Sequence, residues 1–233
     1  MSGRNERATI VLVHGAWADG SSWSSVAGPL LSKGYDVVAA PIPLTSLSDD
    51  AVALERVLER TVGPVALVGH AYAGAVIASV ANARIRSLVF VAALAPDEGE
   101  TVAEMFYRGT PHTRAPHLAP DDHGLIWLPK EAFGIAFSQN VSPERAALLS
   151  VSQRPVAVAC IQEKALRPAW KLKPSWYLIA EQDRMINPAT QHFMAKRMGA
   201  RIRSEQVDHA PLVSAPQPVV EVILEAAAGS CKS

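Results

Sequence analysis

Near-continuous apolar runs recur along the chain, and segments with a single apolar face separate them. Uninterrupted apolar runs are typical of strands that a parallel sheet buries on both faces. Four of them lie in the first half of the chain: TIVLVHG, YDVVAAP, PVALVGH and SLVFVAAL. Two further strand-like runs come near its end, SWYLIAEQD and RIRSEQVDHA. The pattern predicts an α/β fold with a mostly parallel, doubly wound sheet and helices on both of its faces.

The segments between these runs carry signals for crossover helices. Residues 22–33 end with Lys33, and the following Gly34 suits the left-handed turn that ends many helices. Residues 48–62 begin with two aspartates in the first turn and continue with leucines on one stripe. A last helix is predicted to begin near Pro216. Strands and helices therefore alternate through most of the chain.

Residues 95–174 break this alternation. They are rich in Pro and His and contain no clear strand. Three aromatic stretches are predicted to be short helices: EMFYRG, GLIWLP and EAFGIAF. We therefore predict a core of residues 1–94 and 175–233, with residues 95–174 inserted as a helical cap over the carboxyl edge of the sheet. A second independent domain is the alternative, although roughly 80 residues with so few apolar runs would form a thin core.

Composition and charge narrow the classes of function. Hydrophobic residues make up 49% of the chain and charged residues 19%, which supports a sizeable core. The 22 Lys and Arg residues balance the 22 Asp and Glu residues, so no basic excess indicates nucleic acid or an anionic membrane surface. No apolar run approaches the roughly 20 residues that span a bilayer, and the charged first residues lack a signal-peptide pattern. We expect a cytoplasmic monomer or homodimer that binds a small-molecule substrate, with no nucleic-acid or membrane partner.

Neither a disulfide nor a metal site is expected. Cys160 and Cys231 have no C-x-x-C spacing, and two separate thiols in a reducing compartment are favoured over a single disulfide. His112, His117 and His123 lie in a Pro-rich stretch with no carboxylate or Cys at ligand spacing. We therefore predict a solvated loop there, and no metal or organic cofactor.

The stretch LVGHAYAG predicts a sharp turn from a strand into a helix. Many hydrolases place a nucleophilic serine at such a turn, in the pattern G-x-S-x-G. Here Gly69 and Gly74 flank the turn, and Ala71 occupies the position of the serine. Two backbone N–H groups would bind the oxyanion of an acyl-transfer reaction. They belong to Ala16, after the first strand, and to Tyr72, which follows the nucleophile position.

Two later segments supply a candidate acid and a candidate base. Asp183, in LIAEQDRMINP, stands just past a strand and would orient a histidine ring. His209, in VDHAPLVSAPQPV, lies between the last strand and the last helix and would be the general base. The chain order of nucleophile, acid and histidine is the order found with this type of turn. Glu181 and Asp97 are alternative acids.

Four segments together resemble the α/β-hydrolase superfamily, in the branch of plant methylesterases, hydroxynitrile lyases and small bacterial esterases: VLVHGAWADGSSW, LVGHAYAGAVI, AEQDRMINP and DHAPLVSAPQPVV. They cover both ends of the chain and leave only residues 95–174 unmatched. The resemblance implies the α/β-hydrolase fold and acyl transfer without a cofactor. The branch has Ser where this chain has Ala71. Its hydroxynitrile lyases have Lys where this chain has Ala210, so cyanohydrin cleavage by that route is not expected.

Ala71 leaves three interpretations open. An alanine cannot attack a carbonyl, and loss of the nucleophile typically costs on the order of 10⁶ in kcat. Because Asp183 and His209 are retained, the simplest interpretation is an inactive Ser→Ala variant of a carboxylesterase or lactonase-like enzyme. A naturally serine-less lyase or decarboxylase that uses His209 as acid or base is the first alternative. A receptor that binds a small ligand without turnover is the second.

Aromatic residues supply the candidate substrate contacts. They are Trp17, Phe106, Tyr107, Trp127, Phe133 and Phe137. Such a lining favours an apolar or aromatic acyl or alcohol group in the substrate. His70 is predicted to be a buried hydrogen-bonding residue behind the turn, and His14 a partly structural residue close to the oxyanion loop.

Overall fold

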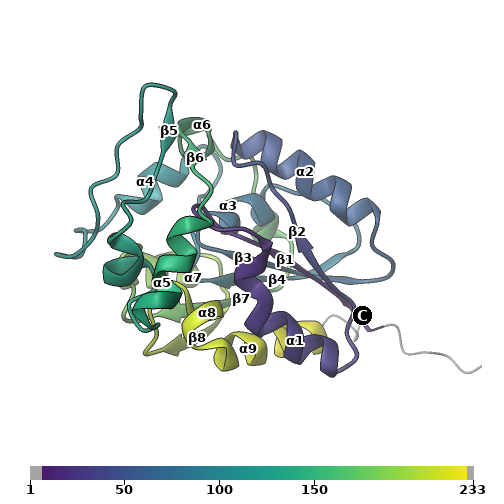
Figure 1. The fold of residues 1–233 in the computed structure, drawn as a ribbon. Coiled ribbons are helices and arrows are strands. Elements are labelled where there is room, and N and C mark those ends of the chain that lie inside the picture. Colours follow the sequence, from purple (N-terminus) through teal and green to yellow (C-terminus); the bar gives the residue numbers. More distant parts are fainter. Residues whose placement is uncertain (1–6, 230–233) are drawn as a thin grey trace, which may run out of the picture.

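The computed structural model describes residues 7–229, which build one six-stranded parallel sheet (Figure 1). Its strands lie in the order β2-β1-β3-β4-β7-β8, and every neighbouring pair is parallel. The bounds are Thr9–Val13 for β1, Val37–Ala40 for β2, Val65–His70 for β3, Ile85–Val91 for β4, Ser175–Ala180 for β7 and Arg201–Glu205 for β8. All six predicted strands are therefore present.

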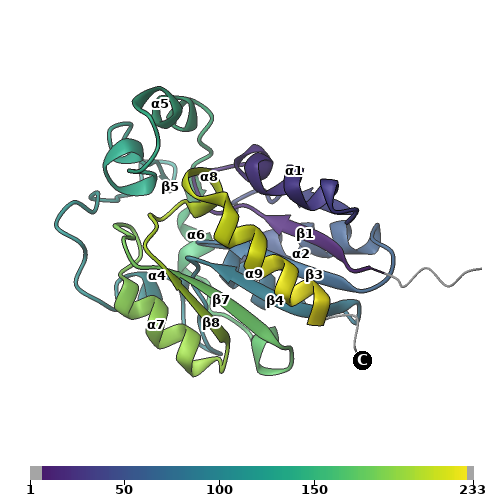
Figure 2. The same ribbon diagram turned by 90° about the horizontal axis from the view of Figure 1, so that it is seen from below.

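Helices cover both faces of this sheet. The bounds of the flanking helices are Ser24–Ser32 for α1, Leu47–Glu59 for α2, Ala73–Ala78 for α3, Pro188–Arg197 for α7 and Pro216–Gly229 for α9. In Figure 1, α1 and α9 lie below the sheet, whereas α2 and α3 lie above it. Figure 2 shows α9 running across the central strands on its own face. Helix α9 buries a stripe that includes Val219, Ile223 and Ala226, as its apolar spacing predicts.

Strand β2 departs from the prediction that the first four strands are buried on both faces. Val37 and Val38 are half-buried, Ala39 is exposed and only Ala40 is buried. The reason is that β2 is an edge strand with β1 as its sheet neighbour, so it lies at the margin of the covering layers.

The candidate site segments meet at the carboxyl edge of the sheet. The chain crosses from β1 to β2 on one side and then returns to β3 on the other side of β1. The strand order therefore reverses between β1 and β3, and such a switch point opens a crevice outside the strand ends. The loop after β1 and the turn after β3 border this crevice. The loops after β7 and β8 carry residues 183 and 209 beyond the same edge.

We call residues 95–174 the cap. Its elements are short, and most gather at the carboxyl end of the sheet (Figure 1). They are α4 (Val102–Phe106), β5 (Leu125–Ile126), the π-helix η2 (Phe133–Phe137), α5 (Pro143–Val151), β6 (Val156–Ala157), α6 (Val158–Gln162) and the 3-10 helix η3 (Ala169–Lys171). Helix α4 overlaps the first of the three stretches predicted to be helical, EMFYRG, and the π-helix η2 lies within the third, EAFGIAF.

The helix predicted for GLIWLP was wrong, because Leu125 and Ile126 form a strand. They pair antiparallel with Ala157 and Val156, about 30 residues further along the chain. A short apolar run satisfies helix and strand patterns equally well, so only the distant partner strand decides between them.

No helix within residues 7–229 combines the length and the apolar character that crossing a bilayer would require. The prediction about the charged first residues falls on residues 1–6, which lie outside the described part of the chain.

Candidate active site

Ala71 stands at the turn between β3 and α3 with a backbone φ of 50°. This left-handed conformation is uncommon for a residue other than glycine and is strained. Neighbouring segments hold it in place: the Ala71 N–H donates to the Val91 carbonyl at 3.2 Å, and the Ala71 carbonyl accepts from Gly74 at 3.1 Å and from Leu94 at 2.9 Å. The strained turn expected for a nucleophile position is therefore present, and its side chain is the methyl group of Ala71.

Two glycines allow the chain to pack closely around this turn. A Cβ at Gly74 would lie 2.4 Å from the Leu94 carbonyl oxygen, and a Cβ at Gly15 would lie 2.9 Å from the His70 carbonyl oxygen. Both distances are too short for any side chain. The same Cβ at Gly15 would be 3.0 Å from the Cβ of Ala71, so the loop after β1 lies directly against position 71.

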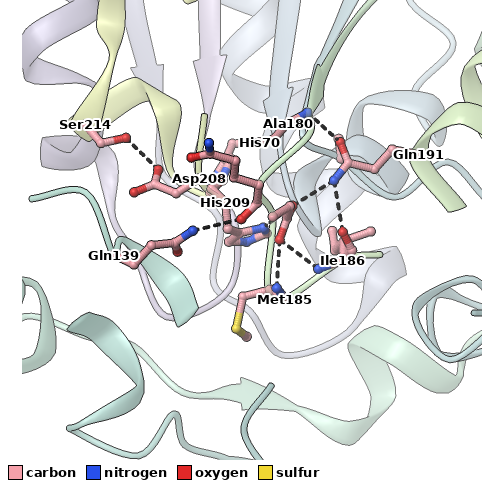
Figure 3. Close-up of polar contacts among 12 residues, drawn as sticks. His70, Gln139, Ala180, Met185, Ile186, Gln191, Asp208, His209 and Ser214 are labelled. Carbon is pink, nitrogen blue, oxygen red and sulfur yellow. Dashed lines mark hydrogen bonds and ion pairs between the residues drawn. The ribbon is translucent and has the colours of Figure 1, made fainter. Parts of the chain in front are cut away.

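His209 and Asp183 form a buried pair (Figure 3). His209 Nδ1 donates to Asp183 Oδ2 at 2.9 Å, and the two side chains are 2% and 0% exposed. Asp183 Oδ1 accepts from the backbone N–H groups of Met185 at 2.7 Å and Ile186 at 2.9 Å. Because a carboxylate only accepts hydrogen bonds, Nδ1 carries a proton, and the tautomer that keeps this bond leaves Nε2 free to accept a proton. The pair therefore has the form of a general base with its orienting acid.

Gln191 on α7 completes the surroundings of Asp183, and the sequence did not single it out. Its amide nitrogen donates to Asp183 Oδ2 at 2.8 Å and to the Ile186 carbonyl at 3.0 Å, while its amide oxygen accepts from the Ala180 N–H at 3.0 Å. No local motif signals this role, because Gln191 reaches Asp183 only through the packing of α7 against β7.

Ala16 and Tyr72 are the residues whose backbone N–H groups are predicted from the sequence to bind an oxyanion. Both line the same pocket as Ala71 and His209. Among residues 7–229, no group accepts a hydrogen bond from the backbone N–H of either residue. Two backbone donors thus remain available beside position 71. A developing negative charge on a carbonyl oxygen is what such donors stabilise.

The pocket is narrow and almost entirely apolar. Its cavity volume is about 50 Å³, which leaves room for a small organic group. Its walls carry no Lys, Arg, Asp or Glu, and His209 is the one titratable histidine among them. The sheet side contributes residues at positions 16, 17, 71, 72, 94, 185, 186 and 209, and the cap contributes those at 102, 103, 106, 107, 118, 126, 156 and 161.

Three of the six aromatic candidates line this pocket: Trp17, Phe106 and Tyr107. The other three lie elsewhere. Trp127 is 47% exposed and donates from its ring nitrogen to Asp121 at 3.2 Å. Phe133 and Phe137 are buried within the cap. The ring of Phe137 packs edge-on against the ring of His209, and the two ring centroids are 5.2 Å apart.

A buried polar cluster lies beside the pocket, and it was not expected from the sequence. The Tyr72 hydroxyl donates to Asp50 Oδ2 at 2.7 Å, and the Leu44 N–H donates to Asp50 Oδ1 at 2.7 Å. The Cys160 thiol lies 3.7 Å from the same carboxylate. Burial raises the pKa of Asp50, and the hydrogen bonds from Tyr72 and Leu44 oppose that rise. The sequence predicts Asp50 only as one of two aspartates in the first turn of a helix, but its side chain is fully buried and bonds to Tyr72.

His70 is buried, as predicted, and His14 is buried as well; the ring of each bonds to a backbone carbonyl. His70 Nε2 donates to the His209 carbonyl at 2.8 Å, and His14 Nδ1 donates to the Gly15 carbonyl at 3.0 Å. Burial, together with the neighbouring His209 ring, lowers the pKa of His70 to about 3. Burial also lowers the pKa of His14. His70 therefore stays neutral and fixes the main chain of His209.

The two alternative acids do not reach His209. Asp97 pairs with Lys171, and Glu181 accepts from His192 at 2.8 Å. Both pairs lie on the partly exposed surface. Asp183 is thus the carboxylate that bonds the His209 ring.

The cap histidines and the cysteines supply no further chemistry to this site. His112, His117 and His123 are exposed, and residues 7–229 contain no group of three His, Cys, Asp or Glu side chains that could hold a metal ion. Cys160 is a buried free thiol, and burial raises its pKa to about 12. Cys231 lies outside the described residues.

Comparison with known proteins defines the class to which this fold and site belong. The profile of the Alpha/beta hydrolase family matches residues 10–222, so the chain belongs to that family. The crystal structure of polyneuridine aldehyde esterase superimposes with a TM-score of 0.82 at 18% identity, covering 94% of this chain and 99% of that one. The predicted α/β-hydrolase fold is therefore confirmed.

Two proteins with related sequences are named hydrolases. The Carbendazim hydrolyzing esterase of Nocardioides sp. (strain SG-4G) is 33% identical over 119 residues, which are 45% of this chain and 49%, about half, of that esterase. Alpha/beta hydrolase nvfD of Aspergillus novofumigatus (strain IBT 16806) is 25% identical over 246 residues, covering 95% of this chain and 97% of that protein. The first of these relatives is named an esterase and the second an alpha/beta hydrolase.

Proposed function

We propose that this chain is the inactive form of a serine-type carboxylic ester hydrolase, of the carboxylesterase or lactonase kind, with Ala71 at the position of the nucleophile. One observation carries the proposal: Ala71, on a strained turn, shares a pocket with a histidine whose ring is oriented by a buried aspartate. The strain and the buried pair are costly features that an inert scaffold would not require.

The active form would carry a serine at position 71. Its hydroxyl attacks the ester carbonyl while His209 Nε2 takes the proton, and Asp183 stabilises the imidazolium that forms. The N–H groups of Ala16 and Tyr72 bind the oxyanion. His209 then returns the proton to the leaving alcohol, and water releases the acyl group by the same steps. No cofactor is required.

The pocket supports a small uncharged ester with an apolar or aromatic group. Its walls offer aliphatic and aromatic side chains and no charged partner apart from the catalytic histidine. A substrate carboxylate or ammonium group placed there would lose its hydration without gaining an ion pair, which is costly.

Restoring the hydroxyl tests this proposal. Ala71→Ser is expected to raise kcat for a short p-nitrophenyl ester by several orders of magnitude, up to on the order of 10⁶. The double change Ala71→Ser with His209→Ala is expected to return the rate to background. Ala103→Ser is the matched control, because it adds a hydroxyl to the cap wall of the same pocket and is expected to stay inactive. No gain from Ala71→Ser would refute the proposal.

A serine-less lyase or decarboxylase is the second candidate, favoured by a proton-accepting His209 Nε2 in a pocket without a nucleophile. The uncharged walls make it weaker, because a β-keto acid would need a partner for its carboxylate. Release of CO₂ from a β-keto acid by the Ala71 protein, lost in His209→Ala, would favour this candidate. Tight binding of an apolar ligand with no turnover in either form would favour a receptor.

A further inference from the structure

One short segment of the cap, residues 135–140, holds the loop that carries Asp183. The Gln139 side-chain amide donates to the Gln182 carbonyl at 2.8 Å (Figure 3). On the other side of Asp183, the Arg184 guanidinium donates to the carbonyl of residue 135 at 2.7 Å. These two hydrogen bonds fix the residues immediately before and after Asp183.

The same segment also holds the loop that carries His209. The backbone N–H of Asn140 donates to Asp208 Oδ2 at 2.9 Å, and the Ser214 hydroxyl donates to Asp208 Oδ1 at 2.5 Å. Phe137 packs its ring edge-on against the imidazole of His209. The segment thus reaches the residue before the histidine and the histidine ring itself.

Asp208 is a buried carboxylate that the proposed reaction does not use. It is 0% exposed, and burial raises its pKa even though Ser214 and Asn140 donate to it. A buried carboxylate is costly unless its oxygens are hydrogen-bonded, so its two bonds must be kept for it to remain in place. The π-helix η2 contains residues 135 and 137 of this segment and ends just before Gln139, and π-helical turns are rare and concentrated at functional sites.

We propose that Gln139 and Asp208 are positioning residues that tie the Asp183 loop and the His209 loop to one segment of the cap. Neither residue lines the pocket, so each acts through its neighbour in the chain. The two loops follow different strands, and a common anchor keeps the Nδ1–Oδ2 bond of the acid–base pair at its short distance. The effect on turnover rests on the proposed function, whereas the effect on the hydrogen bond does not.

The first experiment uses the Ala71 protein as it stands and reads the His209 Nδ1 proton by NMR. Its far-downfield resonance is assigned by its loss in His209→Ala. Gln139→Ala and Asp208→Asn are expected to shift or broaden it. Gln217→Ala is the matched control, because the exposed Gln217 side chain on α9 bonds to Glu221, and this change is expected to leave the resonance unchanged. An unchanged resonance in Gln139→Ala overturns the proposal, even if Asp208→Asn fails to fold.

The second experiment places the same changes in the Ala71→Ser background. Gln139→Ala is expected to lower kcat about 10-fold, because a small misplacement of catalytic groups is costly, with KM held within about twofold. A change in KM with kcat intact would indicate a role in the pocket wall and would overturn the positioning role. If Ala71→Ser shows no hydrolysis at all, the proposed function fails, and the NMR result still decides the positioning role.

Discussion

The pocket has two halves of different construction. On the sheet side, Ala71, Asp183 and His209 each stand within a few residues of a strand end. On the cap side, the wall consists of apolar side chains from α4, α6, the two-residue strands and the loops between them. The groups that would perform chemistry therefore belong to the sheet half, and the groups that would select the substrate belong mostly to the cap half.

The difference lies in what positions each half. Parallel strand register places the sheet half, and a slip of one residue would turn every side chain to the opposite face. Side-chain packing places the cap half, and apolar packing tolerates substitutions of similar volume at small cost. Changes in the sheet half should therefore affect kcat or folding, whereas changes in the cap wall should affect KM.

The largest effect is expected at Asp183. In the Ala71→Ser background, Asp183→Asn should lower kcat on the order of 10⁴-fold, because the amide no longer holds the His209 ring in the tautomer that accepts a proton. Steady-state kinetics measure this loss of kcat. Asp121→Asn, a change to an exposed carboxylate of the cap, should leave kcat within about twofold. A loss of less than about tenfold at Asp183 would contradict the assignment of the acid.

Matched glycine changes compare the two halves directly. A Cβ at Gly74 meets the Leu94 carbonyl at 2.4 Å, whereas a Cβ at Gly134 meets the Ala146 Cβ at an ordinary 3.6 Å. Gly74→Ala should lower the free energy of unfolding by about 3 kcal/mol. Gly134→Ala should change it by no more than about 1 kcal/mol, in the stabilising direction. Urea denaturation measures both, and equal losses would break the contrast.

His70 should make stability depend on pH. Its pKa is about 3 in the folded protein and 6.5 in the unfolded chain. At a pH below 6.5 the unfolded chain therefore binds a proton that the folded chain does not. Between pH 6.5 and about pH 3 this residue therefore lowers the free energy of unfolding by about 1.4 kcal/mol for each unit that the pH falls, and it contributes no slope above pH 6.5. His70→Gln should flatten the stability curve between about pH 6 and pH 4, measured by denaturation at each pH. Parallel curves for the two proteins would show that His70 is not held neutral.

The smallest effect is expected at the cap wall. In the Ala71→Ser background, Phe106→Ala should raise KM for an aromatic ester about tenfold through lost apolar contact, with little change in kcat. Phe133→Leu is the comparison within the cap, because Phe133 is fully buried away from the pocket. It should reduce stability and leave KM unchanged. A larger rise in KM for Phe133→Leu would mean that the pocket wall extends further than its lining residues indicate.

Much of the molecule could be predicted from local sequence alone. The apolar runs predicted the parallel sheet, and comparison with known proteins confirms the fold class. The turn at Ala71 and the segments around Asp183 and His209 were predictable because each lies next to a strand end. Such positions depend on a few neighbouring residues: glycines where chains approach closely, and polar residues just beyond an apolar run.

Other features were decided only by the tertiary structure. Nothing near Gln191, Asp50 or Asp208 in the sequence reveals their bonds, and the wall of the pocket includes three of the six aromatic residues expected to reach it. The contact between Gln139 and Gln182 spans 43 positions, and that between Asn140 and Asp208 spans 68. Periodicity describes which face of an element is apolar, but it carries no information about which distant side chain lies opposite. That choice is made when the cap packs on the sheet, because only then do buried polar groups find their partners.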